Sequence, residues 1–337
     1  MKFKSIISKL ISLIALGQLI GLAVIISVSL YSSNKASEEV GSRTTSLLQD
    51  NARHRLQDAA SAASYELVAD LERAVQQVQT YASTLSSIHS GLEQTTFSSQ
   101  VARLQVTNST RAALLSNPDA LGVYATFLPN AFDEKDANYI DNTEQGSNET
   151  GRLAPYWARE ASGEVGLESI DEADINDNSV GDNGVSSNAW YNCAINKGSL
   201  CVIEPYCDTI GETLVLMSTA SVPILAEDGK VLGSAGVDIA LSQLTNVAQM
   251  ANNKLYQGLG RIRLVSSSGI IVADSEGENA HSADDWWQNF NGKSEASIVL
   301  DPNQETIRVT VPVAINKGSA NWMTVIELPT HSVLGDV

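Results

Sequence analysis

An uncharged run of twenty-one residues, Leu10–Leu30, stands near the N-terminus and is rich in Ile, Leu, Val and Ala. About 20 such residues are needed to cross the hydrocarbon core of a bilayer as a helix. We therefore expect residues 1–9 to be a short cytoplasmic N-terminus and residues 10–31 to be a transmembrane helix. This anchor restricts the rest of the chain to one side of a membrane.

The charges that flank this run predict its orientation. Three lysines precede it, at positions 2, 4 and 9, whereas Glu38 and Glu39 follow it together with Lys35. The positive-inside rule then places residues after about 32 on the extracytoplasmic side. A cleaved signal peptide is the alternative, but its apolar core is usually 7–15 residues long, and no A-x-A site closes this run.

Residues 35–95 are predicted to form one long helix. They contain no proline, and apolar or small residues recur at helical spacing, as in Leu56, Ala60, Ala63, Leu67 and Leu71. A helix of some 55 residues is about 80 Å long at 1.5 Å per residue. This length is typical of a stalk that leaves the membrane and forms the spine of the following domain. Its polar faces predict a solvated or dimer-facing side.

After Thr107 the chain contains short β-rich runs separated by Gly, Asn and Asp turns, which predict an α+β body with antiparallel sheets. The expected strands are Leu121–Phe127, Leu214–Ile224, Val231–Ile239, Arg261–Val265, Ile270–Ala273, Ser297–Leu300, Thr306–Val313 and Trp322–Leu328. The segment Phe132–Asn188 is acidic and rich in Asn and Gly, so we expect loops with short helices there.

Two segments of the chain resemble each other at a constant offset of 89 residues. Pro223 matches Pro312 and Asp238 matches Glu327, each within a strand, a turn and a returning strand. The offset favours two related sheet modules in tandem. We assign them to residues 96–250 and 251–330, with 331–337 as the start of a return segment to the membrane. Glu327 is expected to be a surface charge on an edge strand, with a vestigial pocket as the alternative.

Composition excludes several functions. The net charge of −18 disfavours a nucleic-acid partner and makes a cationic ligand easier to attract than an anionic one. The sequence lacks a nucleophile elbow, a P-loop and a complete GxGxxG motif, and its four histidines stand singly. We therefore expect no enzyme activity, no catalytic residue, no cofactor and no metal site.

Three cysteines lie within fifteen residues, without a CxxC pair or a nearby histidine that would indicate zinc. An oxidising compartment would permit one disulfide, between Cys193 and Cys201 across a short loop, and would leave Cys207 over. Three reduced thiols are the alternative.

Asp238 is the leading candidate for a binding residue. It lies near the end of an apolar strand beside Gly236, on a hairpin that should be largely buried. A buried carboxylate without a partner costs several kcal/mol, so it needs hydrogen-bond donors or a cation. A ligand ammonium would serve, boxed by aromatic faces worth about 0.5–2 kcal/mol each. The aromatic candidates are Tyr156, Trp157, Trp190, Tyr191 and Tyr206. Core packing is the alternative for each of them, and capping of backbone amides is the alternative for Asp238.

The order of anchor, long helix and two sheet modules resembles the double-Cache (dCache) sensor domain of bacterial chemotaxis receptors. The resemblance covers residues 35 to about 330. The motifs that carry it are Gly151–Trp157 (GRLAPYW), Trp190-Tyr191, Glu204-Pro205-Tyr206 followed by Asp208, and the hairpin Asp228–Ile239. It implies a bacterial inner-membrane location, with a periplasmic ligand pocket in the membrane-distal module. The pocket positions that it implies are Trp190, Tyr191, Tyr206, Asp208 and Asp238.

One departure from the family bears on the ligand. In relatives that bind α-amino acids, Asp at the Asp238 position grips the ammonium, and an Arg two residues before the Trp grips the carboxylate. Here that second position is Asn188. We therefore expect an amine-bearing ligand, such as a polyamine, a biogenic amine or a quaternary amine, with an amino acid as the alternative.

The expected receptor is a homodimer through the long helices. A second membrane span and a cytoplasmic output part are expected beyond Val337, and the cytoplasmic signalling partners would act only through that part. The alternatives are the sensor region of a histidine kinase or of a cyclic-dinucleotide enzyme, and an anchored binding protein.

Overall fold

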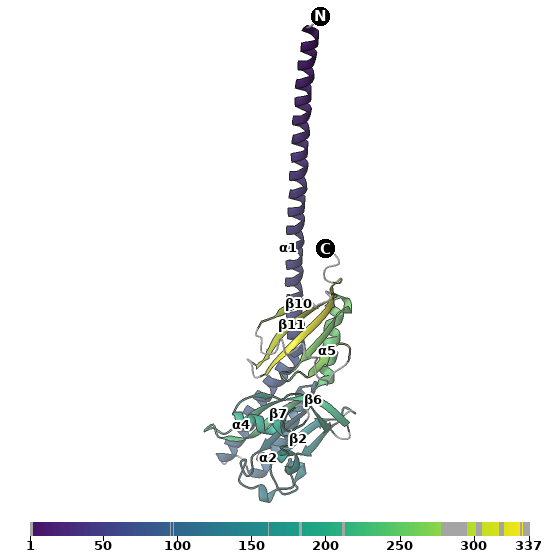
Figure 1. The fold of residues 1–337 in the computed structure, drawn as a ribbon. Coiled ribbons are helices and arrows are strands. Elements are labelled where there is room, and N and C mark those ends of the chain that lie inside the picture. Colours follow the sequence, from purple (N-terminus) through teal and green to yellow (C-terminus); the bar gives the residue numbers. More distant parts are fainter. Residues whose placement is uncertain are drawn as a thin grey trace. The chain divides into compact units, whose positions relative to one another are not determined.

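The computed structural model describes residues 3–94, 96, 98–160, 162–181, 184–210, 213–277, 295–300, 305–316, 320–330 and 332. The expected return segment 331–337 therefore lies outside the described residues, apart from Ser332. One compact unit runs from Leu56 to Ser332, and the other contains the N-terminal residues up to Arg55. Figure 1 labels the helices and strands.

The first element, α1 (Phe3–Glu93), is a continuous helix of 91 residues. Its segment Lys9–Val40 has a mean hydropathy of 2.4 and none of it is buried, so by length and composition it can cross a membrane. Within the compact unit α1 buries the apolar positions that the sequence spacing singled out, among them Leu56, Leu67 and Leu71. The predicted long helix is thus confirmed, and it ends at Glu93.

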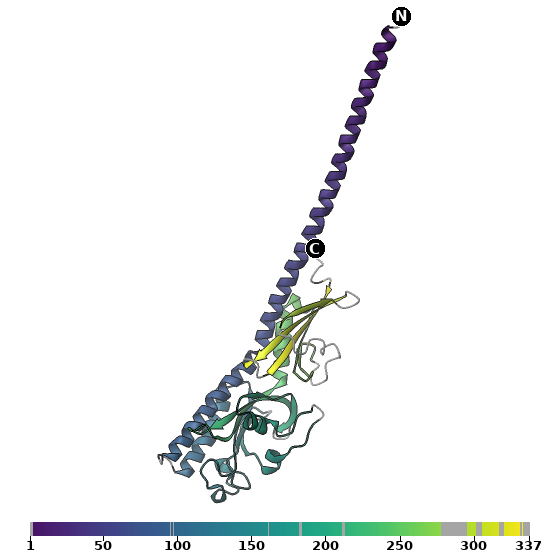
Figure 2. The same ribbon diagram turned by 60° about the vertical axis from the view of Figure 1, so that its left-hand side comes forward.

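A second helix, α2 (Ser99–Ser116), runs alongside the last part of α1 (Figure 2). It begins at Ser98, whose hydroxyl accepts a hydrogen bond from the backbone N–H of Val101 and so caps the first turn. Between the two helices, the Tyr81 hydroxyl forms a buried hydrogen bond of 2.5 Å with that of Thr110. The helix pair gives the first sheet a covered face, because α2 packs on strands β1 and β2.

The first sheet is antiparallel, and within the described residues it has seven strands, in the order β3-β2-β1-β7-β6-β4, with β5 also paired to β6. The strands are β1 (Ala120–Phe127), β2 (Pro155–Arg159), β3 (Val165–Ser169), β4 (Cys201–Val202), β5 (Tyr206–Ile210), β6 (Thr213–Leu225) and β7 (Val231–Ala240). The three central strands β1, β7 and β6 are those that the sequence predicted, because their apolar runs are buried on both sides.

The prediction for Phe132–Asn188 was partly wrong. Short helices are present, namely η1 (Asp136–Asn138), η2 (Thr143–Gln145) and α3 (Glu172–Asn176), but so are strands β2 and β3. The residues of β3 are half-buried or exposed, so its sequence lacks the apolar run of a central strand. Strand β2 begins with Pro155, which cannot donate a ladder hydrogen bond and so weakens the strand signal.

Arg103 of α2 holds the loop that leads into β2. Its side chain is completely buried and donates to the carboxylates of Asp133 and Asp136, at 2.7–2.8 Å, and to Ser147 and the carbonyl of Gly151. Five hydrogen bonds from one planar group thus hold four residues of the loop, an arrangement that lysine could not reproduce.

The second sheet has five strands among the described residues, in the order β10-β11-β12-β8-β9. They are β8 (Arg261–Val265), β9 (Ile271–Asp274), β10 (Ser297–Leu300), β11 (Thr306–Ile315) and β12 (Ala320–Pro329), and all were predicted to within a few residues. Helix α5 (Leu241–Lys254) packs on β8 and β9 and buries Leu244 and Ala248, and the short η3 (Tyr256–Gly258) follows it (Figure 1). Most of α5 had been assigned to the first module, yet it covers the second sheet.

The internal repeat holds at the level of strand register. Thr219 faces Asp238 across the β6–β7 ladder, and 89 residues later Arg308 faces Glu327 across the β11–β12 ladder. The order β2-β1-β7-β6 in the first sheet corresponds to β9-β8-β12-β11 in the second. Since β12 is paired on both sides, Glu327 lies on a central strand, and its expected place on an edge strand was wrong.

Candidate ligand-binding cavity

A cavity of about 290 Å³ opens on the face of the first sheet that α3 and α4 (Ala189–Lys197) border. Five of the seven predicted binding residues line it: Tyr156, Trp190, Tyr206, Asp208 and Asp238. The other lining residues are Tyr124, Glu168, Ser169, Ile170, Asp171, Asp174, Asp177, Ser187 and Thr209. Residues from β1, β2, β3, β5, β7, α3 and α4, far apart in the sequence, therefore converge on one site.

Asp238 is the most buried carboxylate of this site, with 4% of the residue exposed. The Thr219 hydroxyl donates to its Oδ1 at 2.6 Å, and the Tyr206 hydroxyl lies 2.6 Å from the Thr219 oxygen. Because the Thr219 proton is used on Asp238, Tyr206 donates to Thr219. The Tyr156 hydroxyl also hydrogen-bonds Asp238. Asp238 thus rests at the end of a chain of neutral hydroxyl donors.

Two glycines make room for the tyrosines. A Cβ at Gly122 would collide with the Tyr156 ring, and one at Gly236 would collide with the Tyr124 ring. Gly122 and Gly236 lie on neighbouring strands β1 and β7, and Gly122 faces Asp238 directly. The missing side chains therefore leave room for the rings of Tyr156 and Tyr124 over strands β1 and β7.

Burial raises the pKa of Asp238 to about 7. The Thr219 hydrogen bond opposes this shift, and the nearby charge of Asp208 adds to it. Burial also raises the pKa of the Asp208 carboxyl. The pKa values of Tyr156 and Tyr206 are raised well above their usual range, first by burial and then by the charge of Asp238. Both tyrosines are neutral donors at physiological pH.

The lining of the cavity is strongly acidic. Its carboxylates are Glu168, Asp171, Asp174, Asp177, Asp208 and Asp238, whereas its described lining contains no Lys, Arg or His. Burial and the neighbouring charges of Asp171 and Asp208 raise the pKa of Asp174, so the carboxylates repel one another. A cavity with walls of one charge concentrates ligands of the opposite charge.

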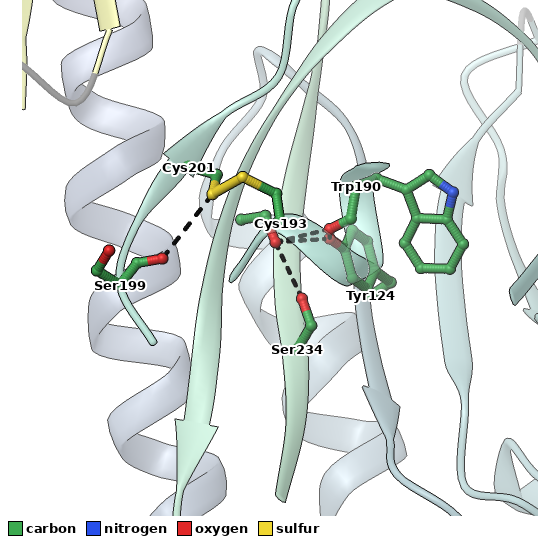
Figure 3. Close-up of a disulfide and its surroundings, with 7 residues drawn as sticks. Tyr124, Trp190, Cys193, Ser199, Cys201 and Ser234 are labelled. Carbon is green, nitrogen blue, oxygen red and sulfur yellow. Dashed lines mark hydrogen bonds between the residues drawn. A yellow bond between two sulfur atoms is a disulfide. The ribbon is translucent and has the colours of Figure 1, made fainter. Parts of the chain in front are cut away.

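Trp190 and Tyr124 form the aromatic wall. Their rings meet edge to face with centroids 5.0 Å apart. The Tyr124 hydroxyl donates to the Trp190 carbonyl at 2.5 Å, and Ser221 donates to the same carbonyl at 2.7 Å (Figure 3). Ser221 in turn is hydrogen-bonded to Ser234 at 2.9 Å. A buried polar network on the central strands thus fixes the first turn of α4, which carries Trp190.

The predicted disulfide is confirmed, because Cys193 of α4 is bonded to Cys201 of β4 (Figure 3). Cys207 is free and exposed. Helix α4 ends at Gly198, whose φ of +63° is a left-handed conformation suited to glycine. The chain then returns through Ser199 into β4. The helix that carries Trp190 is therefore attached covalently to the edge of the sheet.

Two predicted residues, Trp157 and Tyr191, do not line the cavity. Successive side chains of a strand point to opposite faces, so Trp157 points away from Tyr156, and its indole N–H donates to the Thr107 carbonyl of α2 at 3.0 Å. Tyr191 follows Trp190 by one helical position and packs with Ile175 in a hydrophobic cluster. Both are packing residues in this structure. Tyr124 was missed, because its place beside the cavity depends on the register with Gly236.

Asn188, which stands where amino-acid receptors carry Arg, is 1% exposed. Its amide donates to the Ile175 carbonyl at 3.0 Å and to Asn178 at 3.2 Å. It therefore ties loops together rather than facing the cavity. The nearby Arg152 lies 2.9 Å from Glu172 and is paired with that carboxylate.

The second sheet shows how a carboxylate at this register position is neutralised by the protein itself. Glu327, the counterpart of Asp238, receives Arg308 at 2.6–2.7 Å and also pairs with Arg263. Arg308 holds the register position that Thr219 holds in the first sheet. Within the described ranges, no arginine or lysine pairs with Asp238, and no three His, Cys, Asp or Glu side chains are arranged to hold a metal ion.

Comparison with known proteins agrees with this architecture. Residues 106–246 match the family described as methyl-accepting chemotaxis protein-like, first PDC sensor domain. Methyl-accepting chemotaxis protein TlpQ of Pseudomonas aeruginosa is 31% identical over 324 residues, which cover 93% of this chain and 45% of TlpQ. The chain thus spans less than half the length of this relative.

Solved structures share the fold. The structure of a protein named methyl-accepting chemotaxis protein X matches with a TM-score of 0.64 at 23% identity. The match covers 82% of this chain and 98% of that structure. The extracellular domain named after the histidine kinase mmHK1S-Z2 also has a TM-score of 0.64 at 23% identity, covering 84% and 99%. The α+β fold with two antiparallel sheets is therefore shared with these solved structures. On its motifs, its repeated sheets and the family that residues 106–246 match, this chain is similar to the sensor domains of methyl-accepting chemotaxis receptors.

Proposed function

We propose that this chain senses a small amine-bearing molecule in the cavity of the first sheet and passes its binding across the inner membrane, as part of a chemotaxis receptor. The observation that carries the ligand class is the contrast between Asp238 and Glu327. The two carboxylates share one register position, and Glu327 is neutralised by arginines of the chain. Asp238 receives hydroxyl groups, so its cation has to come from outside.

The surroundings of Asp238 suit an ammonium group. A carboxylate held at 4% exposure is costly without a counter-charge, and an ammonium in the cavity would provide one. Tyr124, Tyr156 and Trp190 line the same cavity, and each ring face adds about 0.5–2 kcal/mol of cation–π attraction. A second cationic group on the ligand would meet further carboxylates, because Asp171 and Asp174 belong to the same lining. Polyamines and biogenic amines with a second basic group therefore fit best.

An α-amino acid is the weaker candidate. The sensory domain of the Campylobacter jejuni chemoreceptor Tlp3 holds isoleucine, on a fold that matches this one with a TM-score of 0.53 at 16% identity. An amino acid also brings a carboxylate, which needs a donor of positive charge. Among the described lining residues the charged side chains are all acidic, so the ligand carboxylate would be repelled.

Membrane attachment and dimerisation belong to the same proposal. The segment Lys9–Val40 would span the membrane with residues after about 32 outside. Two surface cavities of about 520 and 510 Å³ share Thr84, Ser109 and Ala112 and form a groove of small and polar residues between α1 and α2. Such a groove can accept side chains from the helices of a second copy. The output part decides between a chemotaxis receptor and a kinase or cyclic-dinucleotide enzyme.

The test is ligand stabilisation of the whole chain in lipid nanodiscs. Putrescine, spermidine, histamine and choline are compared with isoleucine and other α-amino acids in a thermal-shift assay at pH 8. At about 100 times its Kd an amine should add about 2.7 kcal/mol, which raises Tm by roughly 5 °C or more. Asp238→Asn should abolish the shift because it removes the charge that the ammonium meets.

The matched control is Glu164→Gln, which removes a carboxylate from the exposed β2–β3 turn and should leave the shift intact. Stabilisation by α-amino acids with all amines inert would contradict the amine proposal and favour the amino-acid alternative.

A further inference from the structure

The cavity contains a second way to neutralise Asp238, namely a proton. The groups that contact its carboxylate are the hydroxyls of Thr219 and Tyr156. Three solutions exist for a buried carboxylate: an arginine of the chain, a cation from outside, or protonation. The second sheet uses the first solution at Glu327, and the first sheet leaves the other two open to Asp238.

The titratable groups around Asp238 come from every element of the site. Strands β1 and β2 contribute Tyr124 and Tyr156, and β5 contributes Tyr206 and Asp208. The end of β3 and the helix α3, with the residues that flank it, contribute Glu168, Asp171, Asp174 and Asp177. Helix α4 contributes Trp190 and strand β6 contributes Thr219, neither of which is charged. The tyrosines stay neutral and the remaining groups are acids, so each charged neighbour favours protonation of Asp238.

We propose that this cavity is also a pH sensor, in which a proton on Asp238 takes the place of the ligand's cationic group in the empty site. Acidification and ligand binding would then neutralise the same carboxylate, so each excludes the other. The cavity is that of the proposed function, but the proton site stands without any amine. If residues after about 32 lie outside the membrane, as proposed above, the sensor meets external pH.

The charge balance gives the direction of both effects. Burial holds the pKa of the empty site's Asp238 near 7, so neutral pH lies inside its titration. Below that pH a cationic ligand must displace a proton, and its affinity should fall by up to about tenfold per pH unit. Above it, Asp238 is already ionised and the affinity should level off.

The first experiment uses the whole chain in nanodiscs without ligand. Tm is measured from pH 5 to 9 for the unmodified chain and for Asp238→Asn. The difference between the two Tm values at each pH removes the contribution of the other titrating groups. A carboxyl with a raised folded-state pKa contributes stability that is fully present below its unfolded pKa and lost as pH rises through the folded pKa. An unfolded Asp has a pKa of about 3.9, so the Tm of the unmodified chain relative to Asp238→Asn should already fall from pH 5 upward and should level off above about pH 7.

Asp208→Asn provides the sharper variant, because it keeps Asp238 and removes a neighbouring charge. The pH at which the fall levels off should move lower, since the charge of Asp208 helps to raise the pKa of Asp238. Parallel Tm curves for the unmodified chain and Asp238→Asn across this range would overturn the inference, whatever amines do.

The second experiment is calorimetric titration with putrescine at pH 6 and pH 8.5, each in two buffers of different ionisation enthalpy. We expect close to one proton released for each putrescine bound at pH 6 and close to none at pH 8.5. Binding without proton release at pH 6 would contradict the exchange while leaving the proposed function standing. Failure of all amines to bind, with the pH dependence of Tm intact, would reject the amine ligand and keep the proton site.

Discussion

Thr219 and Arg308 stand at the same register position of two related sheets, and each faces a carboxylate across the ladder. The threonine hydroxyl donates one hydrogen bond to Asp238, whereas the guanidinium pairs with Glu327 as an ion. A hydroxyl satisfies hydrogen bonding without neutralising charge, so the choice of one side chain decides whether the site still attracts a cation. The proposed amine recognition therefore depends on the absence of a positively charged side chain at position 219, opposite Asp238.

Thr219→Arg would give the first sheet the arrangement of the second. The guanidinium should pair with Asp238 and extend into the cavity, so amine binding should weaken by 100-fold or more, since one buried charge pair is worth about 3–5 kcal/mol. The fall of Tm between pH 5 and about pH 7 should vanish together with amine binding. Calorimetry with spermidine checks the first effect, and Thr219→Ser, which keeps the hydroxyl, is the control that should bind. Unchanged affinity in Thr219→Arg would contradict the role given to the missing cation.

At the scale of elements, α4 carries Trp190 into the cavity and has two attachments to the sheet. One is the disulfide between Cys193 and Cys201, and the other is the pair of hydrogen bonds that Tyr124 and Ser221 donate to the Trp190 carbonyl. A helix of nine residues is too short to be stable by itself in water, so these attachments determine its position.

Reduction of this disulfide should destabilise the unit without unfolding it. A loop closed across eight residues stabilises by about 2–3 kcal/mol in the chain-entropy account. Urea unfolding with and without a reducing agent should show this difference, and Cys193→Ser should match the reduced chain. Cys207→Ser, at the exposed free thiol, is the control that should not change the unfolding midpoint. An effect of reductant on Cys193→Ser equal to that on the unmodified chain would show that the bond is not its cause.

How far the elements could be predicted depended on burial. The hairpins β6–β7 and β11–β12 were predicted because their strands are continuous apolar runs, and the offset between Asp238 and Glu327 was visible in the sequence. The edge strands β2 and β3 carry no such run, so their residues resembled a loop. Without β2, Tyr156 and Trp157 could not be assigned to opposite faces. Tyr124 was not predicted as a site residue, because its place beside the cavity depends on its pairing with Gly236 across the β1–β7 ladder.

At the scale of the whole molecule, the groove between α1 and α2 is the surface that we assign to a second copy of the chain. Its residues Thr80, Thr84 and Ala112 are small or polar and face outward. The sequence predicted a solvated or dimer-facing side of the long helix, and in the structure the groove on this helix is also lined by residues of α2.

Cysteine cross-linking tests this dimer in membranes. In a Cys207→Ser background, Thr80→Cys should form disulfide-linked dimers on mild oxidation, because like positions of two helices meet near a two-fold axis. The exposed Ser162→Cys of the β2–β3 turn should remain monomeric on the same gel. Equal cross-linking at both positions would indicate random collision instead of a specific interface.

The repeated sheet also sets the form of the dose–response curve. Glu327 in the second sheet is paired with arginines of the same chain, so it does not take up a cation from solution. Asp238 in the first sheet is the carboxylate that responds to the ligand. Of the two related carboxylates, only Asp238 then changes its occupancy with the ligand concentration. Each chain should then titrate along a hyperbola with a Hill coefficient of one, and any steeper curve must arise between chains.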